Sequence, residues 1–510
     1  MKITALIAVP MVAALVTLFI KGDKSKYFAF VASLAPLGIS LYVWSLFDPS
    51  GGNALLDSGA VQFEEAVHWI TLGGYDVQYL VGLDGVSMPL VVLTTFLASL
   101  AILSAWQSID ERQNEFYALV LLLEGGLIGV FTALDFLVFY VFWEAVLVPM
   151  YFLIAVWGGE DRKYAAMKFF VYTNIASLVM FIGVFALIFN SGIDSLSLVA
   201  LTQALQSGGL TGAWGIPADI LVLMAFVALF IGFAVKVPLV PFHTWLPDAH
   251  VQAPTPVSVL LAGVLLKMGT YALLRFNFTM LSDVAAGLTA EIAVVGAVSV
   301  IYGALLAMAQ TDLKRIVAYS SISSMGYVIV GLAAYTEYSV GGATFQMISH
   351  GLISGLLFMV VGVVYHKLHT RDVHEISGLA HRMPVVTTVF VAAAFGYMGL
   401  PGMSGFAAEI FVFLGSMGSF EGSRIIVPVA MFGVVIVAGY LLFAMQRTLF
   451  GEYDAPEEYK DGLTDASITE TVPLVLLVLV IIALGVQPDI AFEMIQSSTA
   501  GVVELTAGGV

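Results

Sequence analysis

Fourteen apolar runs in the sequence are each long enough to cross a lipid bilayer as an α-helix, which takes roughly 20 residues. They lie at about 3–20, 27–47, 84–105, 116–133, 136–157, 166–190, 217–240, 254–277, 291–309, 313–335, 343–365, 385–414, 425–447 and 471–487. Only 11% of the 510 residues are charged, against about 25% in a typical soluble domain. We therefore predict an all-α, polytopic membrane protein.

The composition also excludes several kinds of chemistry. The chain has no cysteine, which removes iron–sulfur ligation, c-type haem attachment, cysteine-ligated zinc and disulfides. It has neither a GxGxxG motif after a predicted strand nor a GxxxxGK[ST] loop for nucleotides. A net charge of −17 argues against nucleic acid as a partner. Any electron carriers that serve this chain must be held elsewhere.

The basic residues predict the orientation. We interpret the first run as a retained span rather than a signal peptide, because only Lys2 precedes it and no clear cleavage site follows. With fourteen spans both termini lie on one side. Fourteen of the 19 basic residues fall on the opposite side: Lys21, Lys24, Lys26, Arg112, Arg162, Lys163, Lys168, Lys314, Arg315, Lys367, Arg371, Arg382, Arg447 and Lys460. Basic loops stay cytoplasmic, so both termini are predicted outside, with the acidic segment 48–76.

The order of spans predicts an internal repeat. We divide the chain into three N-terminal helices with an acidic outer loop (1–115), two five-helix repeats (116–277 and 291–447), and a C-terminal loop with the last span (448–510). Because five is odd, consecutive copies are inverted. Each has a Pro-interrupted span, VKVPLVP at 235–241 and GLPGMSG at 399–405, and paired broken helices indicate an ion path. The alternative is that Pro and Gly are simply common in membrane helices.

Four ionisable residues fall well inside the spans: Glu144, Lys236, Lys267 and Glu409. A charge near the centre of a span costs roughly 2.5–3.5 kcal/mol, so such residues usually serve an ion or proton path. Lysine and glutamate exchange protons when burial and a neighbouring charge shift their pKa, whereas arginine stays charged. If Glu144 pairs with Lys236, joining and separating them would switch the lysine between holding and releasing its proton.

The other polar residues in or near the spans carry weaker signals. His350 lies mid-span and fits either a proton relay or a hydrogen-bonded packing role. Glu124 lies within a span and could take part in the path, but it precedes a Gly pair that would admit a close neighbouring helix. We interpret Asp135 as a helix N-cap and Asp84 as the start of a span without a chemical role. Lys168 and Arg275 are interpreted as side chains that snorkel from the ends of spans. His243, Asp248 and His250 either line a cytoplasmic route or form a solvated turn.

Five motifs together resemble the antiporter-like subunits of respiratory complex I, most closely the subunit M (chain 4) branch with its archaeal and photosynthetic relatives. They are FWEAVLVPMYFLIAVWG, KVPLVPFHTWLPDAHVQAPTPVSVLLAGVLLKMGTYALLR, TDLKRIVAYSSIS, QMISHGL and LPGMSGFAAE, within roughly 80–450. The resemblance implies fourteen helices, broken seventh and twelfth helices, and a half-channel in each repeat. It makes Glu144 the partner of Lys236, Lys267 the central lysine and Glu409 the outlet.

Two details favour subunit M within this family. Position 409 carries glutamate, as in subunit M, whereas subunit L and the similar Mrp-type subunits typically carry lysine there. The long lateral helix of subunit L is also not expected after the last span. Ser324 departs from the pattern, because many relatives carry histidine at this place, and Glu124 is also atypical. The departure implies a relay from Lys267 to Glu409 that depends more on water and His350.

The resemblance implies a non-redox subunit of an NADH (or related donor) quinone oxidoreductase that moves protons outward in the cell membrane. Its partners would be other membrane-arm subunits, within an assembly whose partner subunits carry the flavin and iron–sulfur clusters and act on a quinone-like acceptor; no cofactor is expected on this chain. The alternative is an Mrp-type cation/proton antiporter subunit without a redox partner. A purely structural scaffold fits poorly, since scaffolds need no lysines in mid-bilayer.

Overall fold

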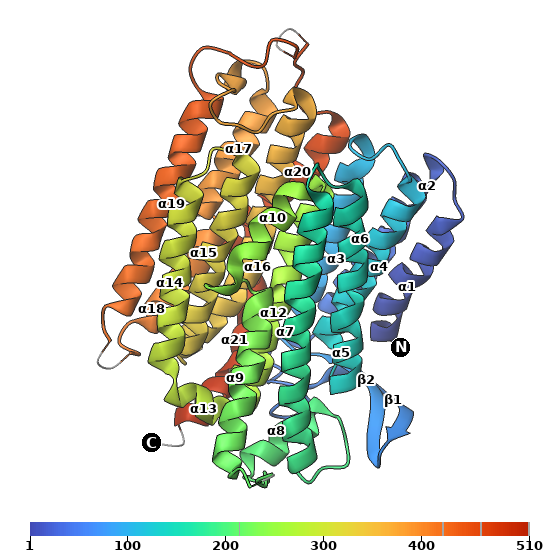
Figure 1. Cartoon of the computed structure of the whole chain (residues 1–510), viewed down its shortest axis with the longest axis vertical. Helices are drawn as coiled ribbons and strands as arrows, with labels where there is room; N and C mark the ends of the chain where they lie inside the picture. Colours follow the sequence, from blue (N-terminus) through green and yellow to red (C-terminus); the bar gives the residue numbers. More distant parts are fainter. Residues whose placement is uncertain (214, 421–422, 460–461, 508–510) are drawn as a thin grey trace.

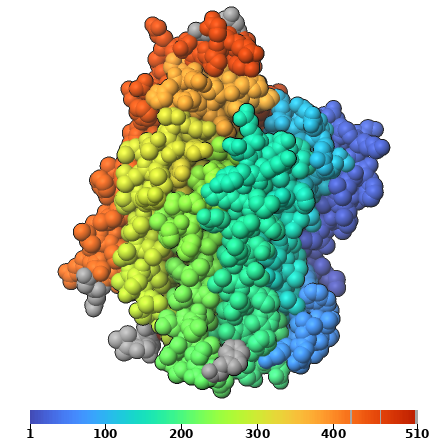
Figure 2. Space-filling model, in the orientation of Figure 1, coloured from blue at the N-terminus to red at the C-terminus, as the bar shows by residue number. Residues whose placement is uncertain are grey.

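The computed structural model describes residues 1–213, 215–420, 423–459 and 462–507. Most of the molecule is helices that run side by side along its long axis (Figure 1), packed without a wide opening on the face seen in Figure 2. Twelve helical segments within the described residues are long and apolar enough to cross a membrane. The architecture is therefore the predicted all-α, multi-span membrane fold.

Every one of the fourteen predicted runs coincides with helix. The twelve long segments are α2 (Lys24–Ser45), α3 with η2 (Ser87–Gln107), α4 (Gln113–Thr132), α5 with α6 (Phe136–Trp157), α7 (Arg162–Asn190), α9 (Ala218–Lys236), α11 to η5 (Thr255–Met280), α14 (Thr289–Met308), α15 (Leu313–Ala333), α16 (Glu337–Leu368), α19 (Ile426–Leu449) and α20 (Ile468–Val486). The shorter α1 (Lys2–Leu18) and the pair α17 (Pro384–Tyr397) and α18 (Ser404–Ser416) complete the set. Both ends of the chain lie toward the lower end of the bundle in Figure 1, as an even number of spans requires. Lys460 lies outside the described residues.

Two spans are broken where the sequence places proline and glycine. Helix α9 ends at Lys236, and a segment with Pro238 and Pro241 leads to η3 (Phe242–Thr244) and α10 (Trp245–Gln252). Proline cannot donate a backbone hydrogen bond and clashes with the preceding turn. Helix α17 ends before Gly399, whose φ of 65° suits glycine, and α18 begins after Pro401. Both predicted interruptions are present.

Two further spans depart from regular α-helix. Helices α5 (Phe136–Ala145) and α6 (Leu147–Trp157) are separated at Val146, because Pro149 cannot donate to the carbonyl four residues earlier. The span after α10 alternates between α11 (Thr255–Leu260), π-helix η4 (Leu261–Leu265), α12 (Leu266–Ala272) and π-helix η5 (Leu273–Met280). π-Helical turns are rare and often mark functional positions.

Polar side chains fix several helix starts. Asp135 accepts hydrogen bonds from the backbone of Leu137 (2.9 Å) and Val138 (3.3 Å), so its predicted N-cap is confirmed. Burial raises the pKa of Asp135 to about 6 despite these bonds. Thr336 and Ser339 form a capping box at the start of α16. These caps satisfy N–H groups that no helical carbonyl can reach.

A β-hairpin at the lower end of the bundle was not predicted. Strands β1 (Gln62–Leu72) and β2 (Tyr75–Leu83) pair antiparallel (Figure 1). Glu65 of β1 accepts hydrogen bonds from Ile3 N (2.9 Å) and Thr4 N (3.1 Å) and pairs with the N-terminal amine (3.0 Å). The hairpin therefore anchors the start of α1. The remaining short elements are η1 (Ser58–Ala60), α8 (Leu198–Gln206), α13 (Ser282–Gly287) and η6 (Leu379–His381).

A helix that the sequence did not indicate, α21 (Asp489–Ala507), follows the last span and packs on the loops that precede α3. Phe492 stacks on Phe411 of α18 with ring centroids 4.1 Å apart. The Ser498 hydroxyl donates to the Gly52 carbonyl (2.9 Å) and accepts from Gly85 N (2.8 Å). Helix α21 thus ties α18 to the loops that precede α3.

Candidate functional site

Three of the four ionisable residues predicted within the spans are buried in the bundle, and the fourth, Glu144, is half-buried. Lys236, Lys267 and Glu409 are 1%, 0% and 8% exposed, and one carboxylate oxygen of Glu144 is buried without a hydrogen-bond partner. None of the four residues is therefore exposed at the surface of the bundle. Burial without neutralising contacts is costly, so these groups need protein partners or bound water.

Lys236 rests on an aromatic ring rather than on a carboxylate. Its Nζ lies 3.9 Å from the ring centroid of Trp143, and the indole N–H of Trp143 donates to Ser177 (3.0 Å). A cation over the face of a tryptophan is attracted by the ring electrons. Glu144, the neighbour of Trp143, forms no ion pair with Lys236 among the described contacts. The two side chains of the predicted Glu144–Lys236 pair are therefore separated in this structure, and we call the pair open.

Lys267 and His350 form a short polar contact in the centre of the bundle. Lys267 Nζ lies 2.6 Å from His350 Nδ1 and also donates to the Ala262 carbonyl at 2.5 Å. Ala262 belongs to π-helix η4, whose irregular turn precedes Lys267. His350 lies on α16 and is fully packed. The structure thus joins two of the predicted site residues from helices 83 positions apart in sequence.

Paired glycines let these two helices approach each other. A Cβ on Gly351 would lie 2.7 Å from the Gly263 carbonyl oxygen and 2.8 Å from a Leu93 methyl. Gly351 follows His350 directly, and Gly263 lies one turn before Lys267. Small residues allow close backbone approach between membrane helices. The short Lys267–His350 contact therefore depends on two positions without side chains.

We predict that Gly351→Ala lowers the stability of the bundle. The added methyl group overpacks a backbone contact, which typically costs about 1–3 kcal/mol, and must push η4 away from α16. Thermal unfolding of the purified protein measures the loss. Gly355→Ala is the matched control, because a Cβ there meets its nearest neighbours at an ordinary 3.4–3.5 Å. Equal behaviour of the two variants would contradict the prediction.

Glu409 reaches back across the break between α17 and α18. A Cβ on Gly399 would lie 2.5 Å from a carboxylate oxygen of Glu409, so only glycine fits there. Ser404, the first residue of α18, hydrogen-bonds to Ser349 of α16 over 2.9 Å. That bond places the broken helix beside His350. Glu409 is thus on the same side of the bundle as the Lys267–His350 pair, without touching it.

The polar groups after the first break are not in a solvated turn. His243 and His250 are buried, and His250 stacks on Phe358 with ring centroids 4.5 Å apart. Asp248 forms an ion pair with Lys168 (2.7 Å), so Lys168 does not simply snorkel. The solvated-turn alternative is therefore wrong. Lys314, which we placed in a basic loop, is also buried and donates to the Ala253 carbonyl.

Arg275 and Asp84 form a buried ion pair that the sequence interpretation missed. The guanidinium of Arg275 in η5 binds both carboxylate oxygens of Asp84, at 2.6 and 2.5 Å. Asp84 also accepts from Ala54 N and Ser87 N. Arg275 is 2% exposed, so its predicted snorkelling is wrong. The pair connects η5 to the start of α3 and to the loop that contains Ala54.

Glu124 is fully buried in α4, and neither of its carboxylate oxygens has a hydrogen-bond partner among the described residues. The neighbouring Gly125 and Gly126 closely approach α1 and Val146, as predicted for this Gly pair. An unpaired buried carboxyl favours its neutral form or a bound water. No described contact joins Glu124 to the other site residues.

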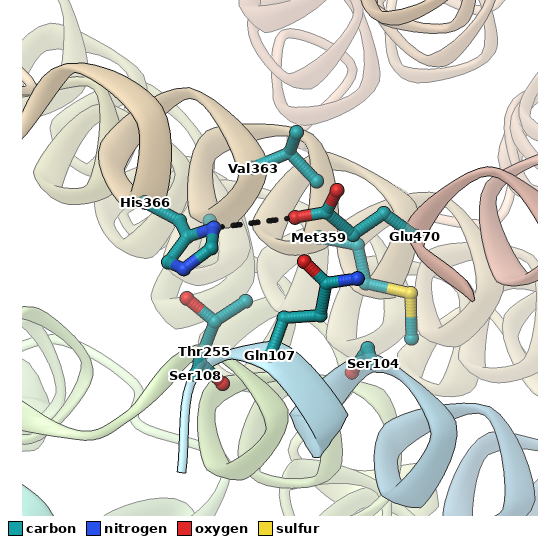
Figure 3. A pocket seen from close by; sticks show the side chains of 9 residues that line it. Ser104, Gln107, Ser108, Thr255, Met359, Val363, His366 and Glu470 are labelled. Carbon is teal, nitrogen blue, oxygen red and sulfur yellow. Dashed lines mark ion pairs between the residues drawn. The ribbon is translucent and has the colours of Figure 1, made fainter. Parts of the chain in front are cut away.

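A small cavity lies near the upper end of the bundle, apart from the predicted site. It measures about 30 Å³, enough for about two waters at roughly 10–15 Å³ each. Figure 3 shows His366 and Glu470 facing each other across it, with an ion pair of 3.4 Å between them. Gln107 and Thr255 also line it. No group suited to hold a metal ion is found among the described residues.

The comparisons with known proteins agree over nearly the whole chain. Residues 133–437 match the family described as "NADH:quinone oxidoreductase/Mrp antiporter, TM", and residues 67–130 match "NADH-ubiquinone oxidoreductase chain 4, amino terminus". The F(420)H(2) dehydrogenase subunit M of Methanosarcina mazei is 40% identical over 99% of this chain and 98% of that protein. The NADH-quinone oxidoreductase subunit M of Rhodobacter capsulatus is 40% identical over 94% of this chain and 91% of that protein.

A solved structure shares the fold along the full length. A chain of respiratory complex I from Thermus thermophilus with bound NADH superimposes with a TM-score of 0.84 at 27% identity, covering 99% of this chain and 100% of that chain.

Proposed function

Because the chain belongs to the NADH:quinone oxidoreductase/Mrp antiporter membrane family, we propose that it is the proton-translocating subunit M of a complex I-like quinone oxidoreductase. Electron transfer on partner subunits drives protons outward through this chain. The chain itself carries out no redox step. The partner subunits hold the flavin and iron–sulfur clusters and act on a quinone-like acceptor, with NADH or a related donor as the source of electrons.

The contact between Lys267 and His350 is the observation that carries this proposal. An ammonium 2.6 Å from an imidazole nitrogen can pass its proton directly, because the imidazole has a free lone pair when neutral. Lys267 holds the proton in the centre of the bundle and His350 receives it. Glu409 takes it onward across the break before α18. A packed structural core would have no reason to bury these three groups together.

Glu144 and Lys236 form the corresponding path in the first half of the chain. With the pair open, Lys236 rests on Trp143. Closing the pair would stabilise the charged lysine, and opening it would favour proton release, because a nearby carboxylate offsets the cost of burial. Each half thus has one broken helix with an ionisable residue beside the break: Lys236 ends α9, and Glu409 lies in α18.

The two halves are inverted repeats in this proposal, 116–277 and 291–447, flanked by an N-terminal region (1–115) and a C-terminal region (448–510). The paired breaks support this division. The chain lies in the cell membrane with both termini outside, because the basic loops are at the end of the bundle opposite the termini. Its neighbours are other membrane-arm subunits.

Purification of the tagged chain from native membranes tests the proposed function. We expect the quinone-reductase subunits to co-purify, and the reconstituted complex to move protons across liposome membranes only when an electron donor is supplied. NADH, reduced ferredoxin and a reduced deazaflavin are tested in turn. Co-purification with a small set of other antiporter subunits, and Na⁺/H⁺ exchange without any donor, would instead identify an Mrp-type antiporter.

A further inference from the structure

A buried tyrosine stands between the Lys267–His350 pair and Glu409. His350 Nδ1 faces Lys267, while His350 Nε2 is buried without a hydrogen-bond partner among the described residues. The Tyr397 ring meets the His350 ring edge to face, with centroids 5.8 Å apart. Tyr397 is the last residue of α17, so it directly precedes the break at which Gly399 contacts Glu409. Tyr397 therefore contacts His350 on one side of a gap that no described contact bridges, and it lies two residues before the glycine that packs against Glu409 on the other side.

The hydroxyl of Tyr397 belongs to a cluster of hydroxyl groups. Ser324 of α15 donates a hydrogen bond to the Tyr397 oxygen over 3.0 Å, which leaves the phenol proton free for another acceptor. The hydroxyl also interacts with the side chains of Ser320 and Ser321, and the charge of Glu409 acts on it. All lie in the packed interior. Hydroxyl groups in such a cluster both donate and accept, so they can pass a proton without retaining a charge.

We propose that the Tyr397 hydroxyl, held by Ser324, conducts the proton between His350 and Glu409. In each transfer the phenol oxygen accepts a proton from the His350 side while its own proton leaves toward Glu409. The tyrosine ends neutral, one proton has moved, and no oxidant or reductant is needed. This inference rests on the proposed function and adds the group that spans the break.

A packing role for the tyrosine would depend on its ring alone. The ring is 6% exposed and contacts His350, so removing the whole side chain would disturb the bundle in either case. Phenylalanine keeps the ring and removes only the oxygen. Tyr397→Phe therefore separates conduction from packing.

We expect Tyr397→Phe in the intact, reconstituted complex to lower proton pumping by about tenfold or more, the effect of raising a barrier by ~1.4 kcal/mol. Assembly, judged by native gel, should be unchanged. The matched control is Tyr335→Phe, which removes another buried hydroxyl of the second half of the chain, one that donates to the Phe278 carbonyl (3.0 Å). Full pumping by Tyr397→Phe would overturn the inference.

A rescue variant gives the second measurement. Ser324→His combined with Tyr397→Phe places an imidazole at the position now held by the serine hydroxyl, and we expect it to restore at least about half of the pumping, because an imidazole can also accept and donate a proton. If the complex assembles normally but the histidine does not restore pumping, the loss in Tyr397→Phe indicates a packing role and overturns the inference.

Lys267→Ala serves as the reference variant for the proposed function. If Lys267→Ala pumps normally, Lys267 is not in the path and the Lys267–His350 route of the proposed function fails, whereas if Lys267→Ala is impaired and Tyr397→Phe is not, only the role of Tyr397 is wrong.

Discussion

Replacing Lys267 by alanine is expected to reduce outward proton movement by about a hundredfold or more, the effect of losing a positioned proton-transfer group. Lys267 is fully buried, and its Nζ is the group that contacts His350. Alanine leaves His350 without a proton donor on this side. Measurement uses the reconstituted complex, with pumping recorded as quenching of a pH-sensitive dye and electron transfer recorded in parallel. We expect electron transfer to be slowed or uncoupled.

Lys267→Arg distinguishes a proton carrier from a fixed charge. Arginine keeps the positive charge but does not release its proton near neutral pH, so it should fail as alanine does. Lys163→Ala, at an exposed lysine, is the control for loss of a basic residue. Undiminished proton yield and turnover in Lys267→Ala, or normal pumping in Lys267→Arg, would remove Lys267 from the path.

The spans and the buried charges were predictable because their signals are local. About twenty apolar residues in a row need no partner to indicate a membrane helix. A lysine in the middle of such a run, as at Lys267, is costly wherever the helix packs. The breaks near Pro238 and Pro401 follow equally from the chemistry of one residue type. For these features the structure shows where the residues lie in the bundle, but it does not change what the sequence predicts about them.

Features that depend on distant partners were missed. Arg275 looked like a snorkelling residue because Asp84 lies 191 positions earlier. Tyr397 looked like one of many packing aromatics, since only the fold brings Ser324 and His350 beside it. The π-helical turns before and after Lys267 have no sequence signal that we recognise. The open Glu144–Lys236 pair likewise depends on the placement of Trp143, which spacing alone does not reveal.

The ion pair between Arg275 and Asp84 is expected to be the interaction whose disruption most destabilises the bundle. Arg275→Ala leaves the Asp84 carboxylate buried without its counter-charge, which typically costs about 3–5 kcal/mol. Burial by itself raises the pKa of Asp84, but the Arg275 charge and the hydrogen bonds from Arg275, Ala54 and Ser87 outweigh it and hold the pKa below its ordinary value. Thermal unfolding of the purified chain or complex measures the loss.

The double variant Asp84→Asn with Arg275→Met tests whether the uncompensated charge is the cause. Asparagine still offers a carbonyl oxygen to the backbone N–H groups of Ala54 and Ser87, and methionine fills some of the space left by arginine. We therefore expect the double variant to be clearly more stable than Arg275→Ala. Because the pKa of Asp84 is lowered by folding, the contribution of the pair should be complete above about pH 4 and lost as the pH falls further. A double variant as unstable as Arg275→Ala, or stability that does not fall in acid, would show that packing of η5 against its neighbouring helices, rather than the charge pair, holds this end of the bundle together.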